Sequence, residues 1–394
     1  MKYAIIIPDG AADVALEELA GRTPLQAAEK PHMDWIAAHG KCGAVRTIPK
    51  GMDCGSDVAI LSVLGYDPRQ FYTGRAPLEA AARGVSVGPD DWIFRCNLVT
   101  VVEGLMLDHS AGHISTEEAS SLIAELNRLV AHERIKFYPG VSYRHLMTLA
   151  GEVDVTTTPP HDILDKPIAD HLPRGPGSDL LNIVMDRSRT ILAEHEVNKV
   201  RRDLGENLAS QIWLWGQGKM PKLPSFRDKY GVSGAAITAV DLVRGLAKLI
   251  GWDRIEVPGA TGFLDTNFAG KGAAAIKALA DHDLVCVHVE AGDEAGHQAD
   301  VKGKVHAIEQ IDRHIVGPVL EHLRKLPEWR ILVLPDHPTP CTRRTHTPDP
   351  VPFALAGTGV VSVVQRPFSE TTADASDLRI EHGHELMEYF LKPR

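Results

Sequence analysis

The sequence predicts an α/β protein with a central, mostly parallel sheet flanked by helices and interrupted by an inserted α+β domain. Nearly continuous apolar runs around residues 5, 286 and 332 are typical of buried parallel strands, and segments with helix start signals alternate with them. Between residues 74 and 210, short strands and helices alternate with long proline-containing loops. We therefore expect residues 1–73 and 211–394 to form one domain and residues 74–210 to form the insert.

The composition is that of a soluble globular protein, with 44% hydrophobic and 24% charged residues among 394. A net charge of −10 argues against nucleic-acid binding, which needs an excess of Lys and Arg. Five cysteines without a C-x-x-C pair predict free thiols in a reducing cytoplasm. No leader precedes the first strand and no apolar run approaches the ~20 residues of a membrane helix, so we expect a cytoplasmic protein without a membrane partner.

The first predicted strand, residues 2–7, runs into Asp9 and Gly10. Asp9 is either a turn former before a glycine or a metal-ligand candidate at the carboxyl edge of the sheet. Thr23 then precedes a proline in the pattern of a capped helix start. The next strand is expected at residues 45–47, after two glycines that break the chain.

Ser56 lies where the following helix should begin, between Gly55 and Asp57. Backbone N–H groups and the positive helix end favour a phosphate or a phosphorylated intermediate at such a serine. On spacing alone, an ordinary N-cap is the commoner role. No Gly-x-Ser-x-Gly elbow surrounds Ser56, so a coordinated metal would have to replace a histidine base in activating it.

The predicted insert has strands at residues 92–102 and 135–138 and a helix at residues 115–129. Long loops interrupt it around residues 158–162 and 171–177. Its polar clusters could bind an anionic substrate, although each side chain alone is commonly an ordinary surface group. The substrate-binding candidates are His109, Arg144, His161 and Asp162.

The α/β pattern then resumes, with a strand at residues 235–239, a helix at 240–250 and a buried strand at 283–289. That last strand leads into Asp293 and His297, which one helical turn would place on the same face.

The final apolar run, residues 331–334, ends in Asp336 and His337. Prolines hold the next loop extended, so that His346 can return to the same edge of the sheet. A polar loop with incidental histidines is the alternative for this segment taken alone.

Three separate strand ends thus carry metal-ligand side chains, which favours a dinuclear metal site over a coincidence of turns and loops. Two ions about 4 Å apart can polarise a phosphoryl group and activate its nucleophile together. Oxygen and nitrogen ligands in one set suit Mn²⁺ or Zn²⁺ better than Ca²⁺. The candidate ligands are Asp9, Ser56, Asp293, His297, Asp336, His337 and His346.

These residues lie in an ordered set of motifs: Pro8-Asp9-Gly10, Gly55-Ser56-Asp57, Asp293-Glu-Ala-Gly-His297, Pro335-Asp336-His337 and Thr345-His346-Thr347. The set resembles the archaeal-type cofactor-independent, that is 2,3-bisphosphoglycerate-independent, phosphoglycerate mutases of the alkaline phosphatase superfamily. The resemblance covers almost the whole chain. It implies an alkaline-phosphatase-like fold and the interconversion of 3-phosphoglycerate and 2-phosphoglycerate in glycolysis, without 2,3-bisphosphoglycerate.

The resemblance also implies roles. Ser56 would become phosphoserine, and the insert would close over the site and contact the substrate through the four candidates named above. Mn²⁺ is the preferred metal, with Zn²⁺, Mg²⁺ and Co²⁺ as alternatives. A basic residue beside the phosphoserine is also implied, for which Arg244 is a candidate. One ion would be held by Asp9, Ser56, Asp336 and His337, and the other by Asp293, His297 and His346.

Two other activities stay open. Segments such as Trp213-Leu-Trp215-Gly-Gln-Gly218 and His337-Pro-Thr-Pro340 resemble bacterial proteins proposed as homoserine kinases of threonine biosynthesis. The same serine and metals could pass a phosphoryl group from ATP to homoserine, although no P-loop motif is present. A metal-dependent phosphomonoesterase is the third candidate, and it would need water to reach the phosphoserine.

Overall fold

The computed structural model describes residues 1–130, 132–362 and 365–392, and the chain divides into two compact units. Unit 1 comprises residues 1–72 and 222–394, and unit 2 comprises residues 73–221. No helix in the described part of the chain is long and apolar enough to cross a membrane.

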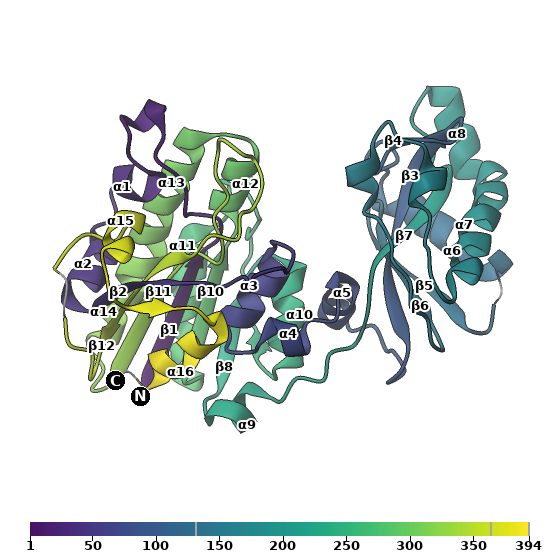
Figure 1. The fold of residues 1–394 in the computed structure, drawn as a ribbon. Coiled ribbons are helices and arrows are strands. Elements are labelled where there is room, and N and C mark those ends of the chain that lie inside the picture. The colour runs from purple at the N-terminus through teal and green to yellow at the C-terminus, as the bar shows by residue number, and fades with distance from the viewer. Residues whose placement is uncertain (131, 363–364, 393–394) are drawn as a thin grey trace. The chain divides into compact units, whose positions relative to one another are not determined.

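Unit 1 is built on an eight-stranded sheet in the order β13-β2-β12-β11-β1-β10-β8-β9 (Figure 1). Only β12 runs antiparallel to its neighbours β11 and β2, and the other pairs are parallel. The predicted α/β class with a mostly parallel sheet is confirmed. The strands are β1 (Lys2–Pro8), β2 (Lys41–Val45), β8 (Gly234–Ile237), β9 (Asp253–Arg254), β10 (Leu284–Val289), β11 (Trp329–Val333), β12 (Val351–Gly357) and β13 (Arg379–Ile380).

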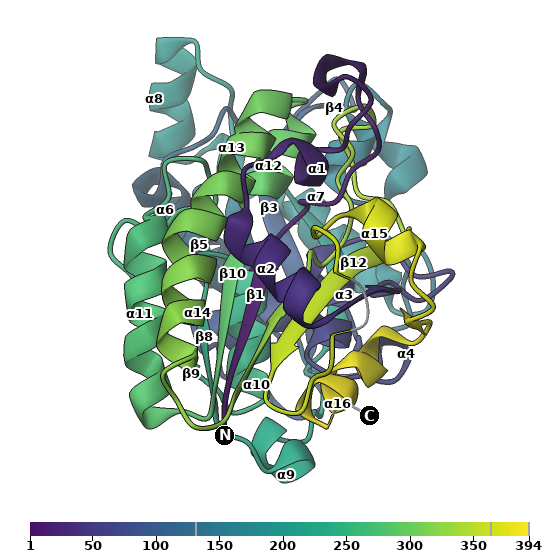
Figure 2. The ribbon, with the colours of Figure 1, turned by 90° about the vertical axis from the view of Figure 1, so that its left-hand side faces the viewer.

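Helices cover the sheet of unit 1, as continuous apolar strands require. Figure 2 shows α2, α11, α13 and α14 in front of one face, and their apolar side chains share a core with that face. The helices are α1 (Pro24–Ala27), α2 (Pro31–His39), α3 (Ser56–Val63), α4 (Pro68–Phe71), α9 (Phe226–Tyr230), α10 (Asp241–Leu249), α11 (Phe268–Asp281), α12 (Ala291–His297), α13 (Val301–Ile311), α14 (Gly317–Leu323), α15 (Glu370–Asp374) and α16 (Leu386–Leu391).

The register of the central strands brings distant polar residues together. Ile6 pairs with Val333 in the parallel ladder of β1 and β11, so Asp9 and Asp336 both lie three residues beyond a paired position. Ile7 pairs with His288 in the ladder of β1 and β10. The carboxyl ends of β1, β10 and β11 therefore form one edge, where open α/β sheets bind their ligands.

Unit 2 has a five-stranded antiparallel sheet in which β3 pairs with β4, β6 and β7, and β5 pairs with β6. Helices α6 and α7 share an apolar core with one face, while α5 packs on the opposite face around Ala76, Ile93 and Leu146. The elements are α5 (Arg75–Arg83), β3 (Trp92–Val102), β4 (Leu105–Asp108), α6 (Thr116–Val130), β5 (Ile135–Val141), β6 (Arg144–Leu149), α7 (Ser178–Ala193), α8 (Glu196–Leu204) and β7 (Gln211–Lys219).

Two expectations about boundaries need correction. The return to the first domain was placed at residue 211, but β7 pairs with β3, so unit 2 continues to residue 221. The strand expected at residues 45–47 is β2, Lys41–Val45. Gly43 lies inside it because a Cβ there would collide with the Leu378 carbonyl, so this glycine permits close packing instead of ending a segment.

Candidate metal centre

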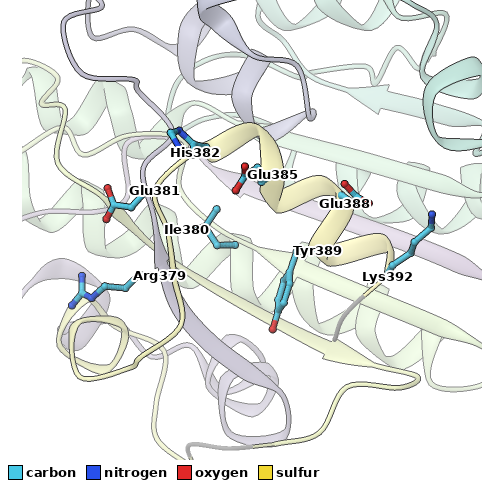
Figure 3. Close-up of a pocket in the computed structure, with 8 residues that line it drawn as sticks. All are labelled: Arg379, Ile380, Glu381, His382, Glu385, Glu388, Tyr389 and Lys392. Atoms are coloured by element: carbon cyan, nitrogen blue, oxygen red, sulfur yellow. The ribbon is translucent and has the colours of Figure 1, made fainter.

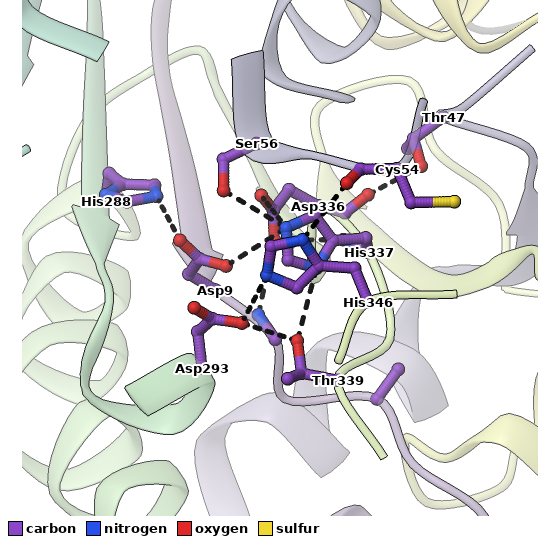
Figure 4. A network of polar contacts seen from close by, with 12 residues as sticks. Asp9, Thr47, Cys54, Ser56, His288, Asp293, Asp336, His337, Thr339 and His346 are labelled. Carbon is purple, nitrogen blue, oxygen red and sulfur yellow. Dashed lines mark hydrogen bonds and ion pairs between the residues drawn. The ribbon is translucent and has the colours of Figure 1, made fainter. Parts of the chain in front are cut away.

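Seven predicted ligands converge at the carboxyl edge of the unit 1 sheet, although they come from five segments, counting Ser56 at the start of α3. β1 delivers Asp9, β11 delivers Asp336 and His337, and these three side chains are 0% exposed. The helix α12 that follows β10 carries Asp293 and His297 on one face, and His346 comes from the loop after β11. Figure 4 shows most of this cluster, with its side chains pointing toward one another.

Ser56 is the first residue of α3, and Gly55 is the N-cap, with extended backbone and no side-chain capping bond. The ordinary N-cap role is therefore wrong for Ser56. Its Oγ lies 3.1 Å from His337 Nε2 instead (Figure 4). The hydroxyl thus faces the ligand cluster and stands at the positive end of a helix, where a phosphate is stabilised.

One ligand group surrounds Ser56. His337 Nε2 lies 3.3 Å from Asp336 Oδ2 and 3.7 Å from Asp9 Oδ1. The backbone N–H groups of Gly10 and His337 donate to Asp336 Oδ1, which leaves Asp336 Oδ2 to face the cluster. Asp336 Oδ2 and both carboxylate oxygens of Asp9 are buried without a hydrogen-bond partner. Such orphaned acceptors fit a bound cation, because buried anionic oxygens otherwise carry a large desolvation cost.

The second group contains Asp293, His297 and His346. The two imidazoles point their Nε2 atoms at each other across 2.9 Å, and these atoms lie 3.2 and 3.3 Å from the Asp293 oxygens. Their Nδ1 atoms lie 3.0 Å from Arg344 O and 3.2 Å from Cys54 O. A carbonyl can only accept, so each Nδ1 carries a proton, and Nε2 of a neutral ring presents a lone pair toward Asp293. Two imidazole nitrogens that face each other beside a carboxylate are a donor set that a bound divalent cation would fit.

The pKa shifts within the metal-free cluster also indicate that it lacks positive charge. Burial raises the pKa of Asp9 well above its usual range, and the charges of Asp336 and Asp293 raise it further. Burial opposes ionisation of Asp293 too, but hydrogen bonds with His297 and His346 hold its pKa well below the usual range. In return, Asp293 raises the pKa of His297 to about 9. The carboxylates compete for the positive charge available, which divalent ions would supply.

His288, on β10, is a site residue that was not predicted from the sequence. It is 1% exposed, burial lowers its pKa to about 4, and its Nε2 lies 2.9 Å from Asp9 Oδ2. Within the run Leu284–Val289 it reads as one polar residue in an apolar strand. Alternation along the strand was the available signal. Residues two apart share a face, so His288 lies on the same face as Glu290, which follows the end of the strand.

The substrate candidates of the insert lie in unit 2. The His109 ring is 6.1 Å from the His161 ring, which is 5.3 Å from Trp215. Arg144 stacks over Tyr143, while the side chain of Asp162 is 61% exposed at the edge of this cluster. Histidines and arginines gathered on one unit can bind an anion.

Arginines that sequence reasoning did not select complete this cluster. Arg95 stacks on Trp215 at 4.1 Å and pairs with Glu79 at 3.1 Å. Burial lowers the pKa of His161, and the charges of Arg95 and Arg75 lower it further. Arg95 alternates with core residues along β3, so period-2 patterning of that strand could have identified it.

Arg244, the candidate for the basic residue beside Ser56, makes polar contacts with other groups. Its guanidinium pairs with Glu256 at 2.7 Å and Asp241 at 3.7 Å and donates to Thr238 O, and these are its contacts within the described residues. None of these polar contacts is with Ser56, and the role of Arg244 as the basic residue beside it stays a prediction.

Unit 1 also contains a cavity of 730 Å³ beside α16, shown in Figure 3. It is lined by Arg379, Ile380, Glu381, His382, Glu385, Glu388, Tyr389 and Lys392. None of the metal-ligand candidates lines it, and its three glutamates give it a chemistry unlike that of a phosphate site.

Comparisons with known proteins agree on one family. The model of the 2,3-bisphosphoglycerate-independent phosphoglycerate mutase family matches residues 37–198. The chain is 52% identical to the 2,3-bisphosphoglycerate-independent phosphoglycerate mutase of Methanothrix thermoacetophila, over 98% of both chains. It is 47% identical to the probable mutase of the same name from Geobacter sulfurreducens, over 99% of this chain and 100% of the relative.

Two solved structures are similar along nearly their whole length. A Pyrococcus horikoshii protein is 30% identical with a TM-score of 0.84, over 99% of this chain and 96% of the other. The cofactor-independent phosphoglycerate mutase of Thermoplasma acidophilum is 27% identical with a TM-score of 0.71, over 100% of this chain and 99% of the other.

Proposed function

The chain belongs to the family of 2,3-bisphosphoglycerate-independent phosphoglycerate mutases, and we propose that it interconverts 3-phosphoglycerate and 2-phosphoglycerate at the metal centre of unit 1. The observation that carries the mechanism is the position of Ser56, whose Oγ lies 3.1 Å from His337 Nε2 at the start of α3. A metal store has no use for a hydroxyl there, whereas a phosphoryl-transfer enzyme needs a nucleophile.

The residues fit two divalent ions. Asp9, Ser56, Asp336 and His337 would hold one ion, and Asp293, His297 and His346 the other. When bound, two such ions lower the pKa of a coordinated hydroxyl and neutralise phosphoryl oxygens. The mixture of carboxylate oxygens and imidazole nitrogens favours Mn²⁺, with Zn²⁺, Co²⁺ and Mg²⁺ as alternatives.

In the proposed reaction, Ser56 Oγ attacks the phosphorus of 3-phosphoglycerate. The bond from phosphorus to the 3-oxygen breaks, so that phosphoserine and glycerate form. The N-terminus of α3 stabilises the phosphoserine dianion, because its backbone N–H groups and dipole face Ser56. The 2-oxygen of glycerate then attacks the same phosphorus, which restores the Ser56 hydroxyl and yields 2-phosphoglycerate.

Glycerate must be held while the phosphoryl group is on Ser56, because water would otherwise release phosphate. The polar cluster of unit 2 is suited to bind a carboxylate: the His109 and His161 rings are 6.1 Å apart, the charge of Arg95 acts on His161, and that of Arg144 acts on Arg95. We assign unit 1 to catalysis and unit 2 to substrate recognition. Arginine can hold a carboxylate through two parallel hydrogen bonds.

The homoserine kinase alternative is not supported by the named relatives, which are mutases at 47–52% identity. The five cysteines are free thiols in the structure, and a reducing compartment suits them, so we place the reaction in the cytoplasm.

The decisive experiment uses metal-loaded protein with Ser56→Ala and, as the matched control, Ser62→Ala. Ser62 is in the same helix, is 0% exposed, and its hydroxyl has no hydrogen-bond partner. Conversion of 3-phosphoglycerate without ATP or 2,3-bisphosphoglycerate should be lost only in Ser56→Ala. Mass spectrometry of acid-quenched protein should find phosphate on Ser56.

Two further assays run in parallel on the same samples. Release of inorganic phosphate without 2-phosphoglycerate would make the protein a phosphomonoesterase. Phosphorylation of homoserine by ATP without mutase turnover would keep Ser56 as the nucleophile and overturn the substrate assignment.

A further inference from the structure

His288 is a polar residue at the metal-centre edge that the proposed ligand sets leave out. It lies on β10 beside β1, directly across the ladder from Ile7. Its side chain is 1% exposed, and its Nδ1 is 3.2 Å from Thr238 Oγ1. The other ring nitrogen, Nε2, points at Asp9 (Figure 4).

The contact between His288 and Asp9 lacks the geometry of a hydrogen bond. Nε2 and Asp9 Oδ2 are 2.9 Å apart, yet both atoms are buried and neither has a hydrogen-bond partner. Two atoms that bind one ion at about 2.1 Å and at right angles lie about 3 Å apart without bonding to each other. The observed distance and the missing hydrogen bond are therefore those of two ligands of a common ion.

The neighbouring ligands close the same site. Ligand atoms of Asp9, His288 and Asp336 lie within 4.8 Å of one another, and all three side chains are buried. Asp9 directs Oδ1 toward His337 and Oδ2 toward His288, so its carboxylate stands between the two imidazoles. The orphaned Asp336 Oδ2 faces the same space.

We propose that His288 Nε2 is a further ligand of the ion held by Asp9, Ser56, Asp336 and His337. This rests on the metal centre of the proposed function. A ligand set that includes two imidazoles would favour Mn²⁺, Co²⁺ or Zn²⁺ over Mg²⁺. Thr238 Oγ1 accepts from Nδ1–H in this arrangement, which orients the ring as partners of ligating histidines commonly do.

A measurement on the unmodified protein tests the ligation without any variant. In Co²⁺-loaded protein, each histidine that ligates through Nε2 gives a strongly shifted, exchangeable Nδ1–H proton resonance. We expect such resonances from His288 in addition to those from His297, His337 and His346. The resonance of His288 should disappear in His288→Asn and persist in the matched control His145→Asn. His145 is equally buried, at 1% exposed, and its Nε2 also lacks a partner, but it lies in unit 2.

Calorimetric titration of the metal-free proteins with Mn²⁺ gives the second measurement. His288→Asn should weaken the binding of one of the two Mn²⁺ ions by more than the roughly 10- to 100-fold that loss of an outer partner costs. His145→Asn should leave both affinities unchanged. His288→Gln serves in the titration if His288→Asn does not fold.

The outcomes are distinct. A shifted resonance of His288 together with loss of one tight ion supports the proposal. Weaker binding with no shifted resonance of His288 in the unmodified protein would make the residue an orienting neighbour of Asp9 and overturn the proposal. If the protein binds no metal at all, the proposed function fails. If it binds two ions and turns over phosphoglycerate but His288 stays unshifted, only this inference fails.

Discussion

Lys304 is a fully buried cation that joins the segments bearing the predicted metal ligands. It lies on α13, and its Nζ donates to Asp13 Oδ2 at 2.8 Å, to Thr339 O at 2.8 Å and to Ala12 O at 3.3 Å. Lys304 and Asp13 are both 0% exposed at the side chain. The three N–H groups are thus all used, and they join the loop after Asp9 to the loop after His337.

Replacing Lys304 with methionine keeps most of the side-chain volume and removes the charge and all three donors. Asp13 would then remain as an uncompensated buried carboxylate that still accepts from the Cys341 and Val14 N–H groups. Breaking a buried ion pair from one side costs about 3 to 5 kcal/mol. We expect Lys304→Met to lower the free energy of unfolding of unit 1 by that amount.

The assay is urea denaturation of metal-free protein, with hydrogen exchange at α13 as the local readout. Lys302→Met is the matched control, because Lys302 lies on the same helix and is exposed. Adding Asp13→Asn to Lys304→Met should restore part of the loss, since it removes the unpaired charge. A loss below about 1 kcal/mol, or no recovery in the double variant, would refute the reasoning.

Three further predictions follow from other parts of the structure. Chelation of the metal-loaded protein should lower its melting temperature, since an ion at 1,000 times its Kd stabilises by about 4 kcal/mol; an unchanged melting temperature on EDTA addition would argue against a filled centre. Gly10→Ala should abolish turnover in a mutase assay, because Gly10 has φ +62° and a Cβ there would lie 2.6 Å from Asp293 Cα. The control Gly21→Ala should retain turnover, because Gly21 has a similar φ of +76° but no atom within 4 Å of the added Cβ. Burial lowers the pKa of His145 to about 3 from 6.5. Between those pH values only the unfolded chain takes up this proton, so the stability of unit 2 falls as pH falls. Hydrogen exchange at β5 and β6 should therefore depend less steeply on pH in His145→Asn.

The position of the site at one edge of the sheet was predictable because the end of each strand can be read from the sequence. An apolar run followed by an acid or a histidine identifies Asp9, Asp293 and Asp336, and parallel strands must bring these ends to one edge. Their actual contacts depend on the register of β1 with β10 and β11, which joins residues about 280 and 330 positions apart. Local sequence carries little information on such pairing.

The features that were predicted wrongly or not at all share a cause: the role of each residue depends on its pairing with a distant segment of the chain. β7 resembles the start of the next α/β unit, but it belongs to the second unit because it pairs with β3 more than a hundred residues away. His288 reads as an exception in an apolar strand until Asp9 is placed beside it. Arg95 reads as an edge charge until Trp215 and Glu79 surround it.

In the predicted metal centre, one set of contacts holds the ligand side chains in place, while their negative charge is left without a partner. Lys304 and Thr339 bind the ligand loops together through contacts that involve no ion: Thr339 Oγ1 donates to Asp293, while Thr339 O accepts from Lys304. Asp336 is oriented by two backbone N–H groups. The predicted ligands are therefore held in place by protein contacts alone, and what remains unbalanced is charge, as the raised pKa of Asp9 and the orphaned oxygens indicate. In the proposed centre, bound ions would mainly neutralise charge at ligands that are already held in place, which would keep Ser56 aimed at the substrate.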